Sequence, residues 1–441
     1  MRRLGPRAVA LIPGSRLARR NSDVEHKYRA PSDLLYLTGF AEPEAFAVIT
    51  PGRDEKYTLF LRPRDPDRET WTGRRVGVEG AVARLGADRA WPIADLAARL
   101  VDLVDGADEL HFLPGDDADT DRLVMATVQT LREGERRGRR SPPRLVDLST
   151  TLHEMRLVKD EDALAKQRRA VAITAEAHVA AMRAARDGMY EYEIEALVDY
   201  TFRRRGCSGP GYPTIVGGGA NATILHYVDN QDPLRRGDLL LIDAGGEYEG
   251  YTADVTRTFP VNARFAPGQR RLYELVLATE KECVALVRPG ATIDEIHSHA
   301  VRRLTAGMVE LGLLTGEVPQ LIESGAYKRF FMHRSSHWLG LDVHDVGAYT
   351  FAPGEAGGAA PGRDAKPTPR PLVPGMVLTV EPGIYIAADA QDVPAEYRGI
   401  GIRIEDDVLV TATGHEVLTA AIPKEIAEIE ALTTSASFSA A

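Results

Sequence analysis

The sequence predicts an α+β fold in two parts, a small α/β domain over residues 1–150 and a larger domain over residues 151–441. A chain of 441 residues is too long for one ordinary hydrophobic core. Before residue 150, strand-like and helix-like segments alternate, as they do in α/β domains. After it, helical segments and strand segments form separate groups, which is typical of α+β domains.

The composition is that of a globular protein and argues against several functions. The chain is 44% hydrophobic and 27% charged, and its formal net charge of −10 argues against a general nucleic-acid binder. Two cysteines imply no disulfide framework. No apolar run approaches the roughly 20 residues of a membrane span, and the apolar part of the basic N-terminal segment is too short for a signal peptide. We therefore expect a cytoplasmic protein without nucleic-acid or membrane partners.

The elements of the first domain follow from periodicity and composition. Apolar segments rich in β-branched and aromatic residues predict strands, and helical spacing predicts helices near 79–104 and 118–135. The Pro- and Arg-rich segment RRGRRSPPRLVD, residues 136–147, is predicted to be the linker to the second domain. The predicted strands cover residues 34–40, 45–52, 56–61 and 109–115.

The second domain begins with helices and continues with strands. Three predicted helices each stop at Gly or at Pro-Gly, and they cover residues 159–187, 191–205 and 269–288. A fourth begins at the capping box TIDE, Thr292 to Glu295. Residues 354–371, rich in Gly, Ala and Pro, predict a surface loop, and residues 433–441 a frayed tail. Strands are predicted over residues 213–219, 238–246, 251–259, 376–386 and 401–411.

The segment LLLIDAGGEYEGYTADVTRTF, residues 239–259, places two carboxylates in one predicted hairpin. If Glu247 pairs with Gly250 across the turn, Asp243 and Asp254 lie directly opposite each other. Their Cβ atoms would then be roughly 4.5–5.5 Å apart. Carboxylates that close repel each other, so either one is protonated or the pair shares a cation. A solvated hairpin with an ordinary turn aspartate is the alternative on this segment alone.

Other acidic and histidine residues follow apolar segments. Glu381 ends the segment VLTVE, and Glu405 lies in an apolar alternation, where a glutamate is rare unless it is paired or binds a metal. The segment MHRSSHWLGLDVHDVG adds three histidines, His333, His337 and His344. The candidate metal-binding set is therefore Asp243, Asp254, His337, Glu381 and Glu405.

This set is rich in hard oxygen donors. It suits Mn²⁺ or Co²⁺ better than a Cys-rich zinc site would, with Zn²⁺ and Fe²⁺ as further candidates. Four carboxylates exceed the charge that one divalent ion neutralises, whereas two ions roughly 3.5–4 Å apart, bridged by two carboxylates, would balance it. Water held between two such ions is a nucleophile near neutral pH.

Four motifs together resemble the metal-binding motifs of the pita-bread metallopeptidases: LLIDAGGEYEGYTADVTRTF, HWLGLDVHDVG, VLTVEPGIYI and GIGIRIEDDVLV. Within that family the sequence is most similar to the aminopeptidase P enzymes, which are Xaa-Pro aminopeptidases. SDLLYLTGFAEPEA and ETWTGRRVG resemble the first domain of these enzymes, so the resemblance covers nearly the whole chain. It implies a pita-bread second domain that hydrolyses the bond between an N-terminal residue and a following proline.

The resemblance also implies a dinuclear metal site, usually occupied by Mn²⁺ in the active enzyme. Asp243 would bind one ion, and Asp254 and Glu405 would bridge the two. His337 and Glu381 would complete the shell of the second ion. Glu381 would in addition pass protons to and from a metal-bridging hydroxide.

Five further roles are implied by the same matching of motifs. His226 would lie beside the substrate amine or carbonyl, and His344 would hydrogen-bond the scissile carbonyl or the oxyanion. His333 would line the proline subsite. Tyr385 and Arg403 would hold ligands and relay protons. Peptides with proline at the second position are therefore the expected partners.

Assembly and chain-length preference follow less directly. Relatives with this N-terminal domain are commonly dimers or tetramers, so we expect a homo-oligomer in which Trp71 reaches a neighbouring subunit. Prolidase, which uses the same scaffold and metals to cleave only Xaa-Pro dipeptides, is the alternative activity, and a non-catalytic peptide-binding module is a further one. Arg334 and the loop 354–371 depart from many relatives, so peptide length stays open.

Overall fold

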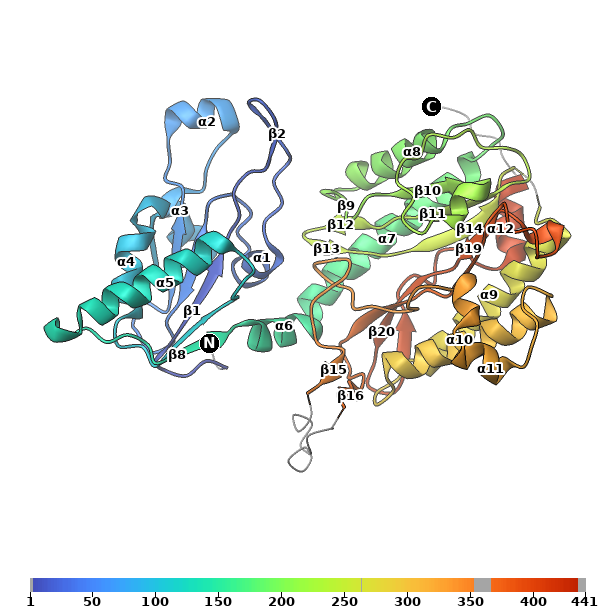
Figure 1. Cartoon of the computed structure of the whole chain (residues 1–441). Coiled ribbons are helices and arrows are strands. Elements are labelled where there is room, and N and C mark those ends of the chain that lie inside the picture. Colours follow the sequence, from blue (N-terminus) through green and yellow to red (C-terminus); the bar gives the residue numbers. More distant parts are fainter. Residues whose placement is uncertain (1–2, 263, 353–365, 435–441) are drawn as a thin grey trace. The chain divides into compact units, whose positions relative to one another are not determined.

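The computed structural model describes residues 3–262, 264–352 and 366–434 (Figure 1). Most of the predicted loop, residues 354–365, and the end of the predicted tail, residues 435–441, lie outside this range. The chain forms two compact units, residues 1–155 and 156–441. No helix in the described part is long and apolar enough to cross a membrane.

The first unit is built on a six-stranded mixed sheet. The strand order is β6-β5-β4-β1-β7-β8, and β1 pairs antiparallel with β4 and parallel with β7. A short hairpin, β2 (Arg19–Asn21) and β3 (Val24–Glu25), stands apart from the sheet. The sheet strands are β1 (Ala8–Pro13), β4 (Phe46–Ile49), β5 (Tyr57–Leu61), β6 (Arg89–Pro92), β7 (Glu109–Phe112) and β8 (Arg144–Asp147).

Helices cover both faces of this sheet because its side chains alternate between two cores. On one face, Val9, Leu11 and Phe60 pack with the apolar residues of α4 and α5. On the other face, Ala10 and Ile12 pack with residues of α1, α3 and the first half of α6. The helices are α1 (Ser32–Thr38), α2 (Pro66–Thr72), α3 (Gly77–Leu85), α4 (Leu96–Val104), α5 (Ala118–Glu133) and α6 (Ser149–Leu157).

Three predictions for this unit were wrong. Residues 34–38 belong to helix α1 and not to a strand; the helix ends at Thr38, and Gly39, with a φ of 65°, forms its left-handed cap. The predicted helix 79–104 is two helices separated by strand β6. The predicted linker contains β8, an edge strand of the sheet. The central strand β1 was not predicted, because its apolar residues were considered only as part of a signal sequence.

The helices of the second unit match the prediction closely. The predicted capping box is present: Thr292 Oγ1 accepts from the Glu295 amide and Glu295 Oε2 accepts from the Thr292 amide, each at 3.1 Å. Helix α7 packs on α8 and on β12, whereas α9 packs on α10 and on β17 to β19. The helices are α7 (Glu161–Ala184), α8 (Glu191–Arg204), α9 (Pro267–Leu286), α10 (Ile293–Glu310), α11 (Val318–Glu323) and α12 (Ile426–Thr434).

The strands of this unit lie between these helix pairs and form several short ladders (Figure 1). Ladders run β10-β11-β14, β9-β12-β13, β17-β20-β21, β18-β19 and β15-β16. The strands are β9 (Gly209–Pro210), β10 (Ile215–Gly218), β11 (Leu239–Asp243), β12 (Gly246–Tyr248), β13 (Tyr251–Thr252), β14 (Thr256–Pro260), β15 (Thr350–Phe351), β16 (Thr368–Pro369), β17 (Val377–Val380), β18 (Gly383–Ile386), β19 (Ile400–Arg403), β20 (Asp406–Val410) and β21 (His415–Val417).

The register predicted for the 239–259 hairpin was wrong by two residues. Tyr248 pairs with Tyr251, so the two turn residues are Glu249 and Gly250, with φ of 49° and 86°. Positive φ at both positions defines a type I′ turn, which takes Gly readily at the second of them. Asp243 consequently pairs with Thr256 and not with Asp254. A shift of two keeps side chains on the same face, so the two aspartates still meet.

Three of the predicted ligands occupy breaks between consecutive strands. Asp254 lies between β13 and β14, Glu381 between β17 and β18, and Glu405 between β19 and β20. At each break the chain leaves one ladder and joins another. The apolar alternation had suggested that Glu405 lies inside a continuous strand, and this was wrong. The breaks free these carboxylates from the regular alternation of a strand and let them converge.

Candidate metal centre

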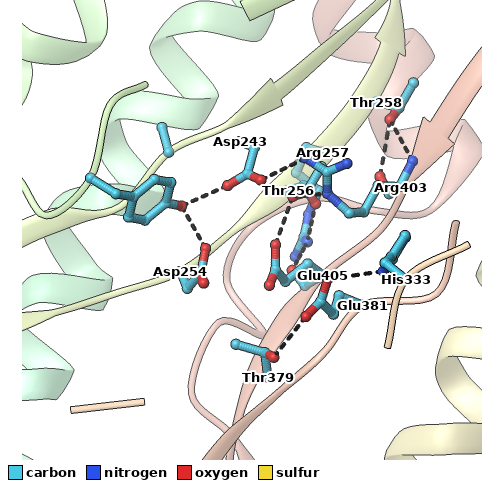
Figure 2. Close-up of polar contacts among 12 residues, drawn as sticks. Asp243, Asp254, Thr256, Arg257, Thr258, His333, Thr379, Glu381, Arg403 and Glu405 are labelled. Carbon is cyan, nitrogen blue, oxygen red and sulfur yellow. Dashed lines mark hydrogen bonds and ion pairs between the residues drawn. The ribbon is translucent and has the colours of Figure 1, made fainter. Parts of the chain in front are cut away.

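All five predicted metal ligands line one cavity of about 890 Å³ in the second unit. They come from segments far apart in the sequence: Asp243 from the end of β11, and the others from three strand breaks and the segment before Trp338. Figure 2 shows Asp243, Asp254, Glu381 and Glu405 directed toward a common centre. Other predicted residues line the same cavity, namely His226, His333, His344 and Arg403.

A tyrosine that the sequence did not single out joins the two hairpin carboxylates. The hydroxyl of Tyr212 lies 2.7 Å from Asp243 Oδ1 and 2.5 Å from Asp254 Oδ1. One hydroxyl has one proton, so it donates to one of the two oxygens at a time. Burial and the nearby charges of Asp243 and Asp254 hold the pKa of Tyr212 well above its ordinary value, which keeps it a donor.

Asp254, His337 and Glu405 form the tightest group. One ligand atom from each lies within 4.8 Å of the other two. His337 Nε2 is 3.3 Å from Asp254 Oδ2 and 3.6 Å from Glu381 Oε1. Its other ring nitrogen, Nδ1, lies 3.0 Å from the Trp338 carbonyl oxygen, a contact that fixes the ring and directs Nε2 into the centre.

Hydrogen bonds from the protein orient the glutamates. Thr256 Oγ1 donates to Glu405 Oε2 at 2.7 Å, and Thr379 Oγ1 donates to Glu381 Oε1 at 3.3 Å (Figure 2). Behind Glu405, the fully buried Arg257 donates to the Glu405 carbonyl oxygen at 2.6 Å and pairs with Asp406. Glu381 is therefore held through one carboxylate oxygen, and Glu405 through a carboxylate oxygen and its backbone carbonyl.

A chain of contacts connects Asp243 with Glu381. Arg403 Nη2 donates to Asp243 Oδ2 at 2.6 Å, and its Nη1 donates to the Tyr385 hydroxyl at 2.9 Å. The hydroxyl lies 2.9 Å from His333 Nε2, whereas His333 Nδ1 lies 2.7 Å from the Arg334 carbonyl oxygen and 3.5 Å from Glu381 Oε2. Burial lowers the pKa of His333 to about 4, so its ring is neutral at physiological pH and can hold one proton between Tyr385 and its neighbours.

His344 and His226 lie beside this group. The rings of His337 and His344 meet edge to face with centroids 4.4 Å apart. Burial and the neighbouring charge of His337 lower the pKa of His344, so this ring is a neutral N–H donor. His226 is exposed and belongs to the cavity wall. Arg334, which also lines the cavity, pairs with Asp294.

The electrostatics fit a multivalent cation. Burial, reinforced by the other carboxylates, raises the pKa of Asp254 and of Glu405, and raises that of Glu381 to about 7. Asp243, Asp254 and Glu405 are buried and Glu381 is partly buried, and the guanidinium of Arg403 offsets one of their negative charges. Hard oxygen donors in excess of protein cations form a site suited to two divalent ions. The residues present therefore fit the predicted metals.

Sequence reasoning missed Tyr212, Thr256 and Thr379, which touch the candidate ligands. The only signal for Thr256 and Thr379 was proximity in the sequence, since each lies two residues from Asp254 or Glu381. Tyr212 lies in the loop before β10 and has no such signal. It is 31 residues from Asp243, and only the folded chain brings the two together.

The Tyr212 hydroxyl supplies a first prediction. Tyr212→Phe keeps the ring but removes the donor between Asp243 and Asp254, so we expect divalent metal to bind about tenfold more weakly. Titration with Mn²⁺ would measure this. Tyr349→Phe is the matched control, because Tyr349 lines the same cavity but its hydroxyl accepts from the Trp338 amide and touches no carboxylate of the cluster. Equal affinities in the two variants would contradict the role.

A second prediction concerns pH. The pKa of Glu381 rises from 4.5 to about 7 through burial; for His337, the Asp254 hydrogen bond and the charge of Glu381 outweigh burial and raise the pKa from 6.5 to about 9. A raised folded-state pKa gives stability that is lost as pH rises. The melting temperature of metal-free protein should therefore fall between pH 7 and 9, above the range in which the lowered pKa values of His333 and His344 act in the opposite direction, and Mn²⁺ should remove most of the slope. A metal-free melting temperature that rises with pH over this range would refute this.

Comparisons with known proteins agree with this geometry. The family described as metallopeptidase family M24 matches residues 165–412, and that described as the aminopeptidase P N-terminal domain matches residues 1–111. The Xaa-Pro aminopeptidase of Escherichia coli strain K12 is 46% identical over 433 residues, 98% of this chain and 95% of the relative.

Two solved structures share the fold over nearly their whole length. Pseudomonas aeruginosa aminopeptidase PepP superposes with a TM-score of 0.93 at 46% identity, covering 98% of this chain and 95% of that one. Zinc-substituted E. coli aminopeptidase P in complex with product gives 0.92 at 45%, covering 99% and 96%. The predicted fold class is thereby confirmed. The chain belongs to metallopeptidase family M24 and carries the aminopeptidase P N-terminal domain in front of the M24 domain.

Proposed function

We propose that this protein is a metal-dependent aminopeptidase that releases the N-terminal residue from peptides with proline in second place. One observation carries the proposal: four carboxylates and His337 converge on one cavity wall in a chain that is 46% identical to a Xaa-Pro aminopeptidase over almost its full length. The relative's name gives the substrate class. The donor set gives the reaction class, metal-assisted hydrolysis.

Asp243, Asp254, His337, Glu381 and Glu405 would hold two divalent ions, with Mn²⁺ as the first candidate. The donors are four carboxylates and one imidazole, which suits Mn²⁺. Zn²⁺ is a second candidate, because E. coli aminopeptidase P has been solved in a zinc-substituted form. When bound, the ions would polarise the scissile carbonyl and lower the pKa of the attacking water.

Glu381 is the residue proposed to move protons. Its carboxylate belongs to the group that would hold the ions and the attacking water, so it lies within reach of the protons that move. His333, whose Nδ1 donates to the Arg334 carbonyl oxygen at 2.7 Å, lies 3.5 Å from Glu381 Oε2 and would keep this carboxylate in place. Glu381 would take a proton from the attacking water and return one to the proline nitrogen as the amide bond breaks.

The histidines of the cavity would orient the substrate. His344, as a neutral donor, would bind the carbonyl oxygen as negative charge develops on it. His226 would contact the substrate amine or carbonyl from the exposed wall. His333 would contact the proline ring, while Tyr385 and Arg403 keep Asp243 and His333 in place.

The substrate bond explains why such a cavity is useful. The nitrogen of an Xaa-Pro bond carries no hydrogen and belongs to a rigid ring, so the extended, hydrogen-bonded binding of ordinary peptidases is lost. A wall shaped for the ring, together with a strongly activated water, would meet both constraints.

Assembly and location complete the proposal. Trp71 is 87% exposed, which is unusual for so large a side chain and favours a homo-oligomer that covers it. We place the enzyme in the cytoplasm on the ground of two buried free thiols, Cys207 and Cys283. Light scattering of wild type and Trp71→Ser would test assembly, since loss of the aromatic side chain should weaken it.

The test of the proposed function is one assay on metal-stripped protein with and without Mn²⁺. It compares an Xaa-Pro dipeptide with an Xaa-Pro-Xaa tripeptide and measures release of the first residue. Mn²⁺-dependent cleavage of the tripeptide supports the proposal. Cleavage of the dipeptide alone would identify a prolidase, and metal binding without cleavage of either peptide would identify a binding module.

A further inference from the structure

The loop that carries His226 is partly exposed at its tip, although Leu225 and Tyr227, on either side of His226, pack against a small hydrophobic cluster. It runs from the short 3₁₀ turn Gly219–Thr223 to Pro233 and supplies Leu225, His226 and Val228 to the cavity. Ile224 and Val228 are 52% and 48% exposed. Apolar packing therefore holds only alternate residues of the tip, and polar contacts elsewhere in the loop provide further positioning.

One fully buried carboxylate supplies those contacts. Glu191, the first residue of α8, is 0% exposed. Its Oε1 accepts from the Gly218 amide at 2.7 Å and from Asn221 Nδ2 at 3.0 Å. Its Oε2 accepts from the Tyr227 hydroxyl at 2.8 Å and from the Asp232 amide at 2.9 Å. One donor, Gly218, lies just before the loop and the other three lie within it; one of these, Tyr227, is the neighbour of His226.

Two further contacts make this anchor rigid. The Glu191 amide donates to the Asp232 carbonyl oxygen at 3.0 Å, so backbone and side chain hold the same end of the loop. Asn230, also fully buried, accepts from the Val216 amide and donates to the Thr214 carbonyl oxygen. Both ends of the loop are thus bound to strand β10 and helix α8. The segment between these ends faces the cavity.

We propose that Glu191 is a positioning residue for His226: it holds the 219–232 loop so that this histidine faces the substrate. The expected effect on catalysis rests on the proposed function. The anchoring of the loop by Glu191 does not depend on that function. A buried donor left without its acceptor destabilises the folded segment that carries it. Loss of the carboxylate would therefore release the loop while leaving the metal ligands untouched, since the contacts of Glu191 lie on this loop and on Gly218.

Glu191→Gln is the direct test, because it preserves shape but puts an NH₂ group against backbone or side-chain donors. Hydrogen–deuterium exchange should become faster in residues 219–233 and stay unchanged in 239–260. With two Mn²⁺ still bound, kcat/KM for Xaa-Pro-Xaa should fall about ten- to hundredfold, as for a misplaced substrate-positioning group. Tyr227→Phe removes one of the four donors and should give a smaller change of the same kind if the glutamine variant folds poorly.

A double-mutant cycle with His226→Ala separates positioning from general destabilisation. If Glu191 acts through His226, the double variant should match His226→Ala within about twofold. Losses that multiply, or wild-type exchange and wild-type kinetics in Glu191→Gln, would overturn the proposal. If wild-type protein cleaves no Xaa-Pro peptide, the proposed function is wrong; exchange alone then decides, and unchanged exchange in residues 219–233 overturns the anchor.

Discussion

Asp254→Ala is expected to abolish tight metal binding and to lower kcat/KM by on the order of 10³-fold or more. Asp254 touches Tyr212 and His337 and lies in the tightest group of donor atoms, so no neighbour can replace it. Its removal leaves three carboxylates, which suits a single ion better than two. Metal titration and steady-state kinetics on the same preparation would measure both effects.

The same substitution should make the stability of the metal-free protein fall less steeply as pH rises. Burial and the charge of Asp243 raise the pKa of Asp254, so ionising it disfavours the folded state. Asp294→Ala is the matched control, because Asp294 lines the same cavity but pairs with Arg334 outside the cluster. An Asp254→Ala variant that keeps two ions and near-normal activity would contradict the dinuclear interpretation.

Arg403→Ala is expected to have the second large effect. Arg403 is 4% exposed and contacts Asp243, Tyr385 and Thr256 at once. Breaking a buried ion pair by removing one partner costs about 3–5 kcal/mol, so metal-free protein should unfold at a much lower denaturant concentration. Added Mn²⁺ should restore part of this stability, because a divalent ion replaces the lost positive charge beside Asp243.

Two variants sharpen this test. Arg403→Lys keeps the charge but cannot reach Asp243 and Tyr385 together, so it should recover most stability and little activity. Arg334→Ala removes a half-exposed cation of the same cavity and should change stability by about 1 kcal/mol or less. If Arg403→Ala and Arg334→Ala destabilise metal-free protein equally, Arg403 does not balance the cluster.

Much of the candidate site could be predicted from sequence because each ligand carries a local signal. A carboxylate at the end of an apolar strand segment is costly unless it is used, and Asp243, Glu381 and Glu405 each stand in such a place. The three histidines around Trp338 gave a second signal. All ten residues predicted for the site line one cavity or contact residues that do, although their functional roles rest on proposal.

What escaped prediction depends on contacts between distant segments. The hairpin register depends on Glu249 adopting a positive φ, and the residue types in the turn did not indicate this conformation. Strand β1 is central because β4 and β7 flank it, and its six residues alone carry no sign of that. Tyr212 and Glu191 act through partners 27–42 residues away. The error at helix α1 has a different origin. Gly39 was a helix-capping signal in the sequence, but the apolar run 34–37 was interpreted as a strand instead.

The measurement that tests the central claim most directly is the number of ions bound per chain. Metal-stripped protein would be titrated with Mn²⁺ while bound metal and tripeptide cleavage are followed together. Two ions per chain, with activity appearing as the cluster fills and both lost in Asp254→Ala, is the predicted result. No bound Mn²⁺, or full activity in protein shown to be metal-free, would contradict the account.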